Sequence, residues 1–403
     1  MVNRNKNIAK LPGGYLFPEI AKRRKAYEAE HPDAKVISLG IGDTPGPLPT
    51  NITAGLVDAA RGMGTKEGYC GYPGQGLDEL RQLINDRFYN GQFELDEIFI
   101  SDGAKCDTGR LQTVFGADNK IALQNPAYPV YLDTAVAMGQ TGDYDTDSEK
   151  FANVCYLDCT PENNFFPDLE PAKSADIIFF CSPNNPTGAT ATREQLEELV
   201  NFAVKNKSTI VFDAAYSAFI NSGDMPTSIF EIEGARDVAI EINSFSKFAS
   251  YTGVRLGWTV IPKDLKFSDG SSVHKDWSRV FNTFFNGTSH ITQVGGIAVL
   301  KDSGWEESKA MVKFFMANAA KIKATLEAKG LEVYAGENAP YIWVKIPGKS
   351  SWETFDYLLH EAQIVCTPGS GFGTAGEGFV RFSAFGTEEN VAEACERLTK
   401  AFE

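Results

Sequence analysis

The sequence predicts an α/β protein with a mostly parallel sheet that is covered by helices on both faces. In the middle of the chain, short apolar runs at 177–180, 209–212, 238–240 and 257–261 alternate with polar turns and helical patterns. Runs of this length and composition are typical of strands that are buried on both faces of a sheet. Strands that alternate with helices indicate parallel pairing, because each crossover returns the chain to the same edge.

The clearest helix start follows the first of these strands. Thr192 lies before apolar residues at helical spacing, and Gln195 follows three residues later. A hydroxyl residue with Glu or Gln three positions on is the capping-box pattern. We therefore expect a helix that begins after Thr192 and packs through Leu196, Leu199, Val200, Ala203 and Val204.

The last part of the chain has a different pattern and predicts a smaller α+β domain. In chain order, we expect helix 308–329, strands 331–334 and 341–346, helix 352–362, strands 364–366 and 379–382, and helix 388–402. The N-terminal segment is expected to join this part. The predicted domains are 1–48 (N-terminal arm and part of the small domain), 49–292 (large domain) and 293–403 (small C-terminal domain).

Composition restricts the class of protein. The 403 residues carry a formal net charge of −15, which disfavours nucleic acid and anionic membrane surfaces as partners. Seven scattered cysteines and four histidines predict neither a disulfide framework nor a metal site, and they favour a reducing compartment. Without an apolar run long enough to span a bilayer or an apolar signal segment at the start, we expect a soluble protein.

Three polar residues fall where predicted strands end. Asn185, Asp213 and Lys247 follow the runs at 177–180, 209–212 and 238–240. Ligands of parallel α/β sheets bind beyond the carboxyl ends of the strands. These side chains are therefore the first candidates for a binding site.

The stretch around Lys247 carries the most chemical information. A lysine held at a strand end, with a lowered pKa, can bond an aldehyde cofactor covalently. Ser244, three residues earlier, and Arg255, eight residues later, have the groups that bind a phosphate. Ser-x-x-Lys alone also fits a solvated loop, and Asp213 alone also fits a turn or a helix cap. When the two residues are considered together, however, Asp213 at a strand end suits the protonated ring nitrogen of such a cofactor.

One glycine pattern does not indicate a nucleotide site. Residues 371–376 have the form Gly-x-Gly-x-x-Gly, which binds dinucleotides when it lies between a strand and a helix. In this chain the strand pattern at 379–382 follows it. We therefore predict a tight glycine loop.

Four motifs in register resemble those of one enzyme family. Asn-Pro-x-Gly at 185–188, Asp-x-x-Tyr at 213–216, Ser-x-x-Lys at 244–247 and Arg255 have the order and spacing of fold-type I pyridoxal-phosphate-dependent transferases of the aspartate aminotransferase family. The resemblance extends from about Tyr15 to the C-terminus. It implies a large domain with a mostly parallel seven-stranded sheet, a smaller α+β domain, pyridoxal 5′-phosphate as cofactor, amino-acid and keto-acid substrates, and a homodimer with shared active sites.

The resemblance also implies roles for individual residues. Lys247 matches the Schiff-base lysine and proton shuttle, Asp213 the partner of the ring nitrogen, and Asn185 and Tyr216 the donors to the ring oxygen. The phosphate binders are matched by Ala104 and Lys105 at a helix start and by Ser244, Ser246 and Arg255. Tyr128 matches the ring that stacks on the cofactor, and Arg381 matches the residue that binds the substrate α-carboxylate. Gly42 and Tyr72 match residues that line the site, and Tyr72 is implied to reach the cofactor phosphate of the other subunit.

Further strings resemble the subfamily of LL-diaminopimelate aminotransferases. They are Gly-Gly-Tyr-Leu-Phe-Pro at 13–18, Leu-Gly-Ile-Gly-Asp-Thr at 39–44, Ser-Asp-Gly-Ala-Lys-Cys-Asp at 101–107, Phe-Asn-Gly at 285–287 and Pro-Gly-Ser-Gly-Phe-Gly at 368–373. This resemblance implies substrate contacts from Tyr15, Lys105 and Asn286, with Asn286 donated across the dimer interface. The implied reaction links LL-2,6-diaminopimelate and 2-oxoglutarate to tetrahydrodipicolinate and glutamate, in lysine biosynthesis. The implied compartment is the plastid stroma or the cytoplasm.

The sequence departs from this subfamily in one place. An acidic residue is expected shortly after Tyr72, to bind the distal ammonium, but the chain continues Pro-Gly-Gln-Gly. Glu67 is an alternative ligand for that ammonium, and it also fits an exposed loop residue. The alternatives to the diaminopimelate activity are an aspartate, aromatic or alanine aminotransferase, or a lyase of the same fold.

Overall fold

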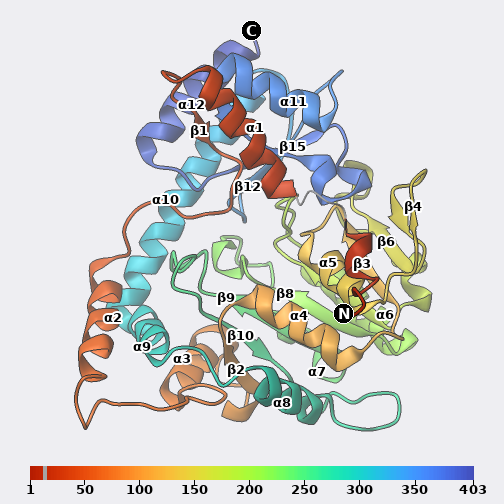
Figure 1. Cartoon of the computed structure of the whole chain (residues 1–403), viewed down its shortest axis with the longest axis vertical. Helices are drawn as coiled ribbons and strands as arrows, with labels where there is room; N and C mark the ends of the chain where they lie inside the picture. The colour runs from red at the N-terminus through yellow and green to blue at the C-terminus, as the bar shows by residue number, and fades with distance from the viewer. Residues whose placement is uncertain (12–15) are drawn as a thin grey trace.

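The molecule has two parts, each with its own sheet and helices, which we call the larger and the smaller layer. The larger layer is built on a mixed sheet. The computed structural model describes residues 1–11 and 16–403. Seven strands lie in the order β2-β10-β9-β8-β7-β3-β6 (Figure 1). They are β2 (Ile98–Ser101), β3 (Ile121–Asn125), β6 (Val154–Asp158), β7 (Ile177–Cys181), β8 (Thr209–Asp213), β9 (Ala239–Ser244) and β10 (Gly257–Val260). Only β10 pairs antiparallel with its neighbours, so the predicted mostly parallel seven-stranded sheet is confirmed.

Two separate cores cover the faces of this sheet. In β7, Ile178 and Phe180 belong to one core and Ile177 and Phe179 to the other, because side chains alternate along a strand. The first core is closed by α2 (Thr50–Gly62), α3 (Asp78–Tyr89), α6 (Arg193–Asn206), α7 (Ala235–Val238) and α9 (His290–Leu300). The second is closed by α4 (Ala104–Phe115), α5 (Val130–Met138) and α8 (Val273–Phe284). Burial on both faces explains why the strands lack polar alternation.

Helix α6 has the predicted capping box. The Gln195 N–H donates to Thr192 Oγ1 at 3.3 Å, and the Thr192 N–H donates to Gln195 Oε1 at 2.9 Å. The helix buries Leu196, Leu199, Val200 and Ala203, but Val204, expected on the same face, is 51% exposed.

The smaller layer lies above the larger one in Figure 1. Its antiparallel sheet has the order β11-β12-β15-β14, and β1 pairs in parallel with β13 beside it. The strands are β1 (Ile37–Ser38), β11 (Glu332–Ala335), β12 (Tyr341–Lys345), β13 (Ile364–Val365), β14 (Thr367–Pro368) and β15 (Phe379–Ser383). Helices α1 (Leu16–Glu30), α11 (Ser351–Tyr357) and α12 (Glu388–Ala401) pack on it, and a π-helical turn at Leu358–Ala362 extends α11.

The two layers share one long helix, α10 (Asp302–Glu327). It begins earlier than the expected residue 308. The reason is Gly304, whose missing side chain lets the helix start pack on α9: a Cβ there would lie 1.9 Å from the Ala298 carbonyl oxygen. Both α9 and the first half of α10 contribute to the larger core. The domain boundaries 1–48, 49–292 and 293–403 stay a prediction.

The remaining strands form a small hairpin. β4 (Tyr144–Asp145) pairs with β5 (Lys150–Phe151). The glycine loop at 371–376 falls within two short 3₁₀ turns, Gly369–Phe372 and Thr374–Gly376, before β15. Across residues 1–11 and 16–403, no helix combines the length and apolar character needed to cross a membrane.

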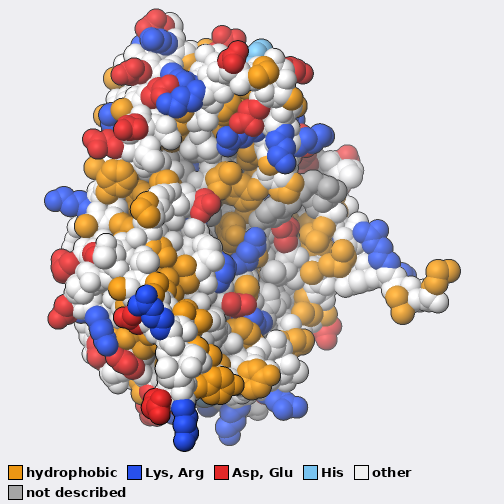
Figure 2. Space-filling model, turned by 60° about the vertical axis from the view of Figure 1, so that its left-hand side comes forward, with side chains coloured by type: hydrophobic (Ala, Val, Ile, Leu, Met, Phe, Trp, Pro, Cys, Tyr) orange, Lys and Arg blue, Asp and Glu red, His pale blue; other side chains and the backbone are white. Residues whose placement is uncertain are grey.

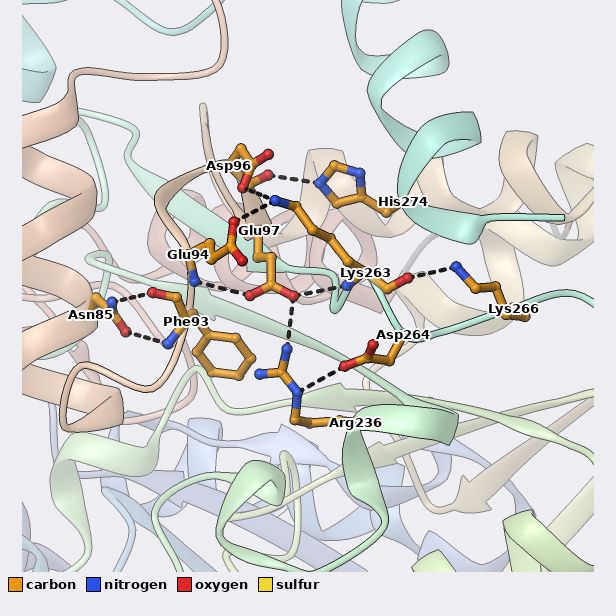
Figure 3. A network of polar contacts seen from close by, with 10 residues as sticks. All are labelled: Asn85, Phe93, Glu94, Asp96, Glu97, Arg236, Lys263, Asp264, Lys266 and His274. Atoms are coloured by element: carbon orange, nitrogen blue, oxygen red, sulfur yellow. Dashed lines mark hydrogen bonds and ion pairs between the residues drawn. The ribbon is translucent and has the colours of Figure 1, made fainter.

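A buried carboxylate connects several segments at one end of the larger sheet (Figure 3). This is the end where the parallel strands begin, opposite their carboxyl ends. Glu97, which is 1% exposed, accepts from Arg236 Nη2 at 2.8 Å, from the Lys263 N–H at 2.8 Å and from the Glu94 N–H at 2.9 Å. These donors come from α7, from the residues after β10 and from the turn before β2. One side chain therefore joins three segments distant in the sequence.

Glu97→Ala is expected to destabilise the fold by about 3–5 kcal/mol, because it leaves backbone N–H donors without a partner and removes the buried carboxylate that pairs with Arg236. Urea unfolding measures the loss. The matched control is Asp264→Asn, which removes the exposed carboxylate that lies 3.4 Å from the same arginine and is expected to cost at most about 1 kcal/mol. Equal effects of the two substitutions would contradict this account of the network.

Candidate active site

A cavity of about 420 Å³ lies at the carboxyl ends of β7, β8 and β9, below the smaller sheet. The space-filling view shows a hollow near the middle of one face, with basic side chains inside it (Figure 2). Twelve of the predicted site residues line the cavity: Gly42, Ala104, Lys105, Tyr128, Asn185, Asp213, Tyr216, Ser244, Ser246, Lys247, Arg255 and Arg381. The polar strand ends identified from the sequence therefore meet in one place.

Lys247 follows β9 and extends its amine into the cavity. The amine donates to the carbonyl oxygen of Gly42. Burial, together with the positive charge of Arg381, lowers the pKa of Lys247 to about 8, although Asp43 opposes the shift. About a tenth of this amine is therefore neutral at pH 7, and able to act as a nucleophile or base, far more than for an ordinary lysine.

Asp213 ends β8 and is held by two donors. The Tyr131 hydroxyl donates to Oδ2 at 2.6 Å, and the Ala215 N–H donates to Oδ1 at 3.0 Å. Burial raises the pKa of Asp213, while these hydrogen bonds favour the carboxylate and work against the shift. The carboxylate is fixed in one orientation at the floor of the cavity.

Arg381 projects from β15 and is 1% exposed. Nη1 donates to Asn185 Oδ1 and Nη2 to the Gly40 carbonyl oxygen, both at 2.6 Å. Its guanidinium carbon lies 4.2 Å from the centre of the Tyr341 ring. Among the described residues, Nε has no hydrogen-bond partner. A buried guanidinium with an unused donor suits a carboxylate.

A cradle for an anion lies at the start of α4. Gly103 precedes the helix with φ +127°, and a Cβ there would lie 2.5 Å from Arg255 Nη2. Arg255 Nη1 donates to Ser246 Oγ at 3.3 Å and to the Thr252 carbonyl oxygen at 3.2 Å. A helix N-terminus, a guanidinium and hydroxyls together form an electropositive site of the kind that binds phosphate.

Several cavity residues were missed from the sequence. They are Phe17, Ile41, Asp43, Thr108, Tyr131, Cys181, Ala215, Thr252 and Tyr341. The most informative are Tyr131, which binds Asp213, and Tyr341, whose hydroxyl lies 2.7 Å from that of Tyr216. For Tyr131 the sequence offered a signal, since it lies three residues after Tyr128; in the structure their rings meet edge to face at 5.9 Å.

Two predicted residues lie outside this cavity in the single chain. Tyr72 is 86% exposed, and Asn286 is also exposed. Their loops adjoin, because a Cβ at Gly287 would lie 2.4 Å from the Gly74 carbonyl oxygen. Their reach into a neighbouring subunit stays a prediction. Tyr15 lies outside the described residues, and Glu67 is exposed.

The fold, a lysine at a strand end, an aspartate beside it and an anion cradle at a helix start define the class of pyridoxal-phosphate-dependent aminotransferases. The chain belongs to the class I and II aminotransferase family, whose model matches residues 34–398. This family and fold use pyridoxal phosphate, and their substrates are small molecules.

Similar proteins cover the whole chain. It is 54% identical over 403 residues to the chloroplastic LL-diaminopimelate aminotransferase of Arabidopsis thaliana, covering all of this chain and 87% of that protein. It is 50% identical over 402 residues to the LL-diaminopimelate aminotransferase of Protochlamydia amoebophila, covering 100% and 98%. The structure of the L,L-diaminopimelate aminotransferase of Chlamydomonas reinhardtii superposes with a TM-score of 0.96 at 55% identity, covering 100% and 99%.

Proposed function

We propose that this protein binds pyridoxal 5′-phosphate at Lys247 and transfers an amino group between LL-2,6-diaminopimelate and 2-oxoglutarate. The products are tetrahydrodipicolinate and glutamate, and the reaction is reversible and belongs to lysine biosynthesis. The observation that carries the proposal is the convergence of Lys247, Asp213 and Arg381 on one cavity. The substrate assignment is supported by the names of relatives that are 50–54% identical over the full chain.

The cavity residues fit the cofactor. The cradle at Gly103, which a side chain would fill, suits its phosphate, and Asp213 suits its ring nitrogen. Because Asn185 Oδ1 already accepts from Arg381, the Asn185 amide N–H would be left to donate to the ring oxygen, and the Tyr216 hydroxyl would donate to it as well. When bound, pyridoxal phosphate supplies an aldehyde that reacts with amines and a ring that accepts the electron pair that a departing proton leaves behind.

Lys247 moves the proton in this proposal. With the cofactor and substrate bound, the Lys247 amine would take the proton from the substrate α-carbon, hold it and give it back. Asp213 would keep the ring nitrogen of a bound cofactor protonated, because a buried carboxylate stabilises a neighbouring positive charge. Arg381 binds the α-carboxylate and so orients the α-proton toward Lys247.

The proposal includes a homodimer with shared active sites. Tyr72 and Asn286 would then reach the partner's cavity, where Tyr72 binds phosphate and Asn286 binds substrate. Their exposure on adjoining loops supports this arrangement. Tyr15, Gly42 and Lys105 are the remaining proposed substrate contacts. The proposed compartment is the plastid stroma or the cytoplasm.

A coupled assay with single amino donors tests the substrate. We expect LL-diaminopimelate to give a higher kcat/KM than meso-diaminopimelate, aspartate, alanine and aromatic amino acids by at least about 10²-fold, because a built polar site rejects poorly matched groups. Preference for aspartate, alanine or an aromatic donor would assign the protein to another class I or II aminotransferase. Product formation without any keto acid acceptor would indicate a lyase.

The rate of cofactor uptake should depend on pH with a midpoint near 8. Only the neutral amine of Lys247 attacks an aldehyde, and burial lowers the pKa of Lys247 to about 8. The neutral fraction therefore rises about tenfold per pH unit below that value and levels off above it. Stopped-flow measurement of visible absorbance, after mixing apoprotein with pyridoxal phosphate, gives the profile. A rate that still rises tenfold per unit at about pH 9 would indicate an exposed lysine instead.

A further inference from the structure

Tyr341 links the two sheets at the cavity. It begins β12 in the smaller sheet and is 1% exposed. Its hydroxyl lies 2.7 Å from the hydroxyl of Tyr216, which follows β8 in the larger sheet. Their rings meet at 5.1 Å and 65°. A buried hydrogen bond of this kind fixes the position of both hydroxyl groups.

Tyr341 also touches two other parts of the site. The Arg381 guanidinium carbon lies 4.2 Å above its ring, a distance at which a cation is attracted to the aromatic face. A Cβ at Gly42 would lie 2.6 Å from the Tyr341 hydroxyl and 3.4 Å from Lys247 Nζ. The hydroxyl therefore lies close beside the backbone segment that accepts a hydrogen bond from Lys247.

Counting protons decides the direction of the hydroxyl–hydroxyl bond. Each tyrosine has one O–H proton, and either oxygen is placed to act as donor. If Tyr216 uses its proton on the cofactor's ring oxygen, it has none left for Tyr341. Tyr341 must then be the donor, and a donated proton on the Tyr216 oxygen makes Tyr216 a stronger donor itself.

We propose that Tyr341 is a positioning residue. Its hydroxyl donates to Tyr216 and so directs the Tyr216 proton at the cofactor's ring oxygen, and its ring fixes the orientation of the Arg381 guanidinium that lies against it. The inference rests on the proposed function, because it requires pyridoxal phosphate in the cavity. In this proposal Tyr341 of β12 connects Arg381, which binds the substrate carboxylate, with Tyr216, which binds the cofactor.

Tyr341→Phe tests the hydroxyl in the cofactor-loaded protein. We expect the pH midpoint of the cofactor's visible absorbance to rise by about half a unit or more, because a weaker Tyr216 donor stabilises the deprotonated ring system less. The double variant Tyr216→Phe/Tyr341→Phe should shift no further than Tyr216→Phe alone, since both residues act through one contact. Tyr341→Leu removes the ring as well, and should raise KM for the amino donor about fivefold beyond Tyr341→Phe.

The matched control is Tyr357→Phe. This substitution also removes a tyrosine hydroxyl from the smaller layer, where it donates to the Ala401 carbonyl oxygen, but Tyr357 does not line the cavity. Its absorbance midpoint should equal that of the unchanged protein. Thermal unfolding of each apoprotein verifies folding.

The outcomes separate the two proposals. If the protein without any substitution takes up no cofactor, the proposed function is overturned, and this inference with it. Normal uptake with an unchanged midpoint in Tyr341→Phe, or a shift that adds fully to that of Tyr216→Phe, overturns the inference alone.

Discussion

Lys247→Ala is expected to lower kcat by at least about 10⁴-fold, the largest effect of any single substitution in the cavity. The substitution removes the only proposed base for the substrate α-proton and the amine that bonds the cofactor. It leaves Asp213, Arg381 and the anion cradle in place, so pyridoxal phosphate should still bind, without a covalent bond. Steady-state kinetics and the visible spectrum measure the two losses separately.

Borohydride reduction gives an independent result for the same residue. A pyridoxyl group should be trapped on the peptide that contains Lys247, and peptide mass mapping identifies it. Lys263→Ala is a suitable control, because that lysine pairs with Glu94 and Asp96 outside the cavity. Label on another lysine, or activity retained by Lys247→Ala, would refute the assignment.

Asp213→Asn is expected to lower kcat by about 10³-fold, the magnitude of losing one preorganised electrostatic contact at a reaction centre. An amide has no negative charge to hold the ring nitrogen's proton. It also has one acceptor oxygen, whereas Tyr131 and the Ala215 N–H donate to both carboxylate oxygens. The readout is kcat at saturating substrate, with cofactor content determined in parallel.

Tyr131→Phe provides a graded comparison for Asp213→Asn. It removes one hydrogen bond and leaves the charge, so a loss of about tenfold is expected. Equal losses in both variants would mean that orientation matters rather than charge. Retention of kcat within about tenfold by Asp213→Asn would contradict the role given to the carboxylate.

The larger sheet and the linear motifs were predictable from sequence for physical reasons. Strands buried on both faces must be apolar throughout, so β7 and β8 are visible as runs that end at polar residues. The capping box at Thr192 is a local contact and was found for the same reason. Where the structure departs, as at the start of α10, the cause is a tertiary contact that only Gly304 permits.

The missed part of the site consists of contacts between distant segments. Tyr131 and Asp213 are 82 positions apart, and Tyr216 and Tyr341 are 125 apart. The strand that contains Tyr341 was expected, but its pattern does not reveal which face meets the cavity. The contacts expected across a subunit interface, from Tyr72 and Asn286, involve a second chain and stay predictions.

Helix α10 has a consequence for how the molecule loses its structure. Its 26 residues span about 39 Å, and it gives Val312 and Phe315 to the core of the larger layer and Ala319, Ile322 and Leu326 to that of the smaller. Helical hydrogen bonding is cooperative, so melting that begins at one end propagates along the rod. Heating should therefore disrupt both layers in a single transition, although each has its own hydrophobic interior.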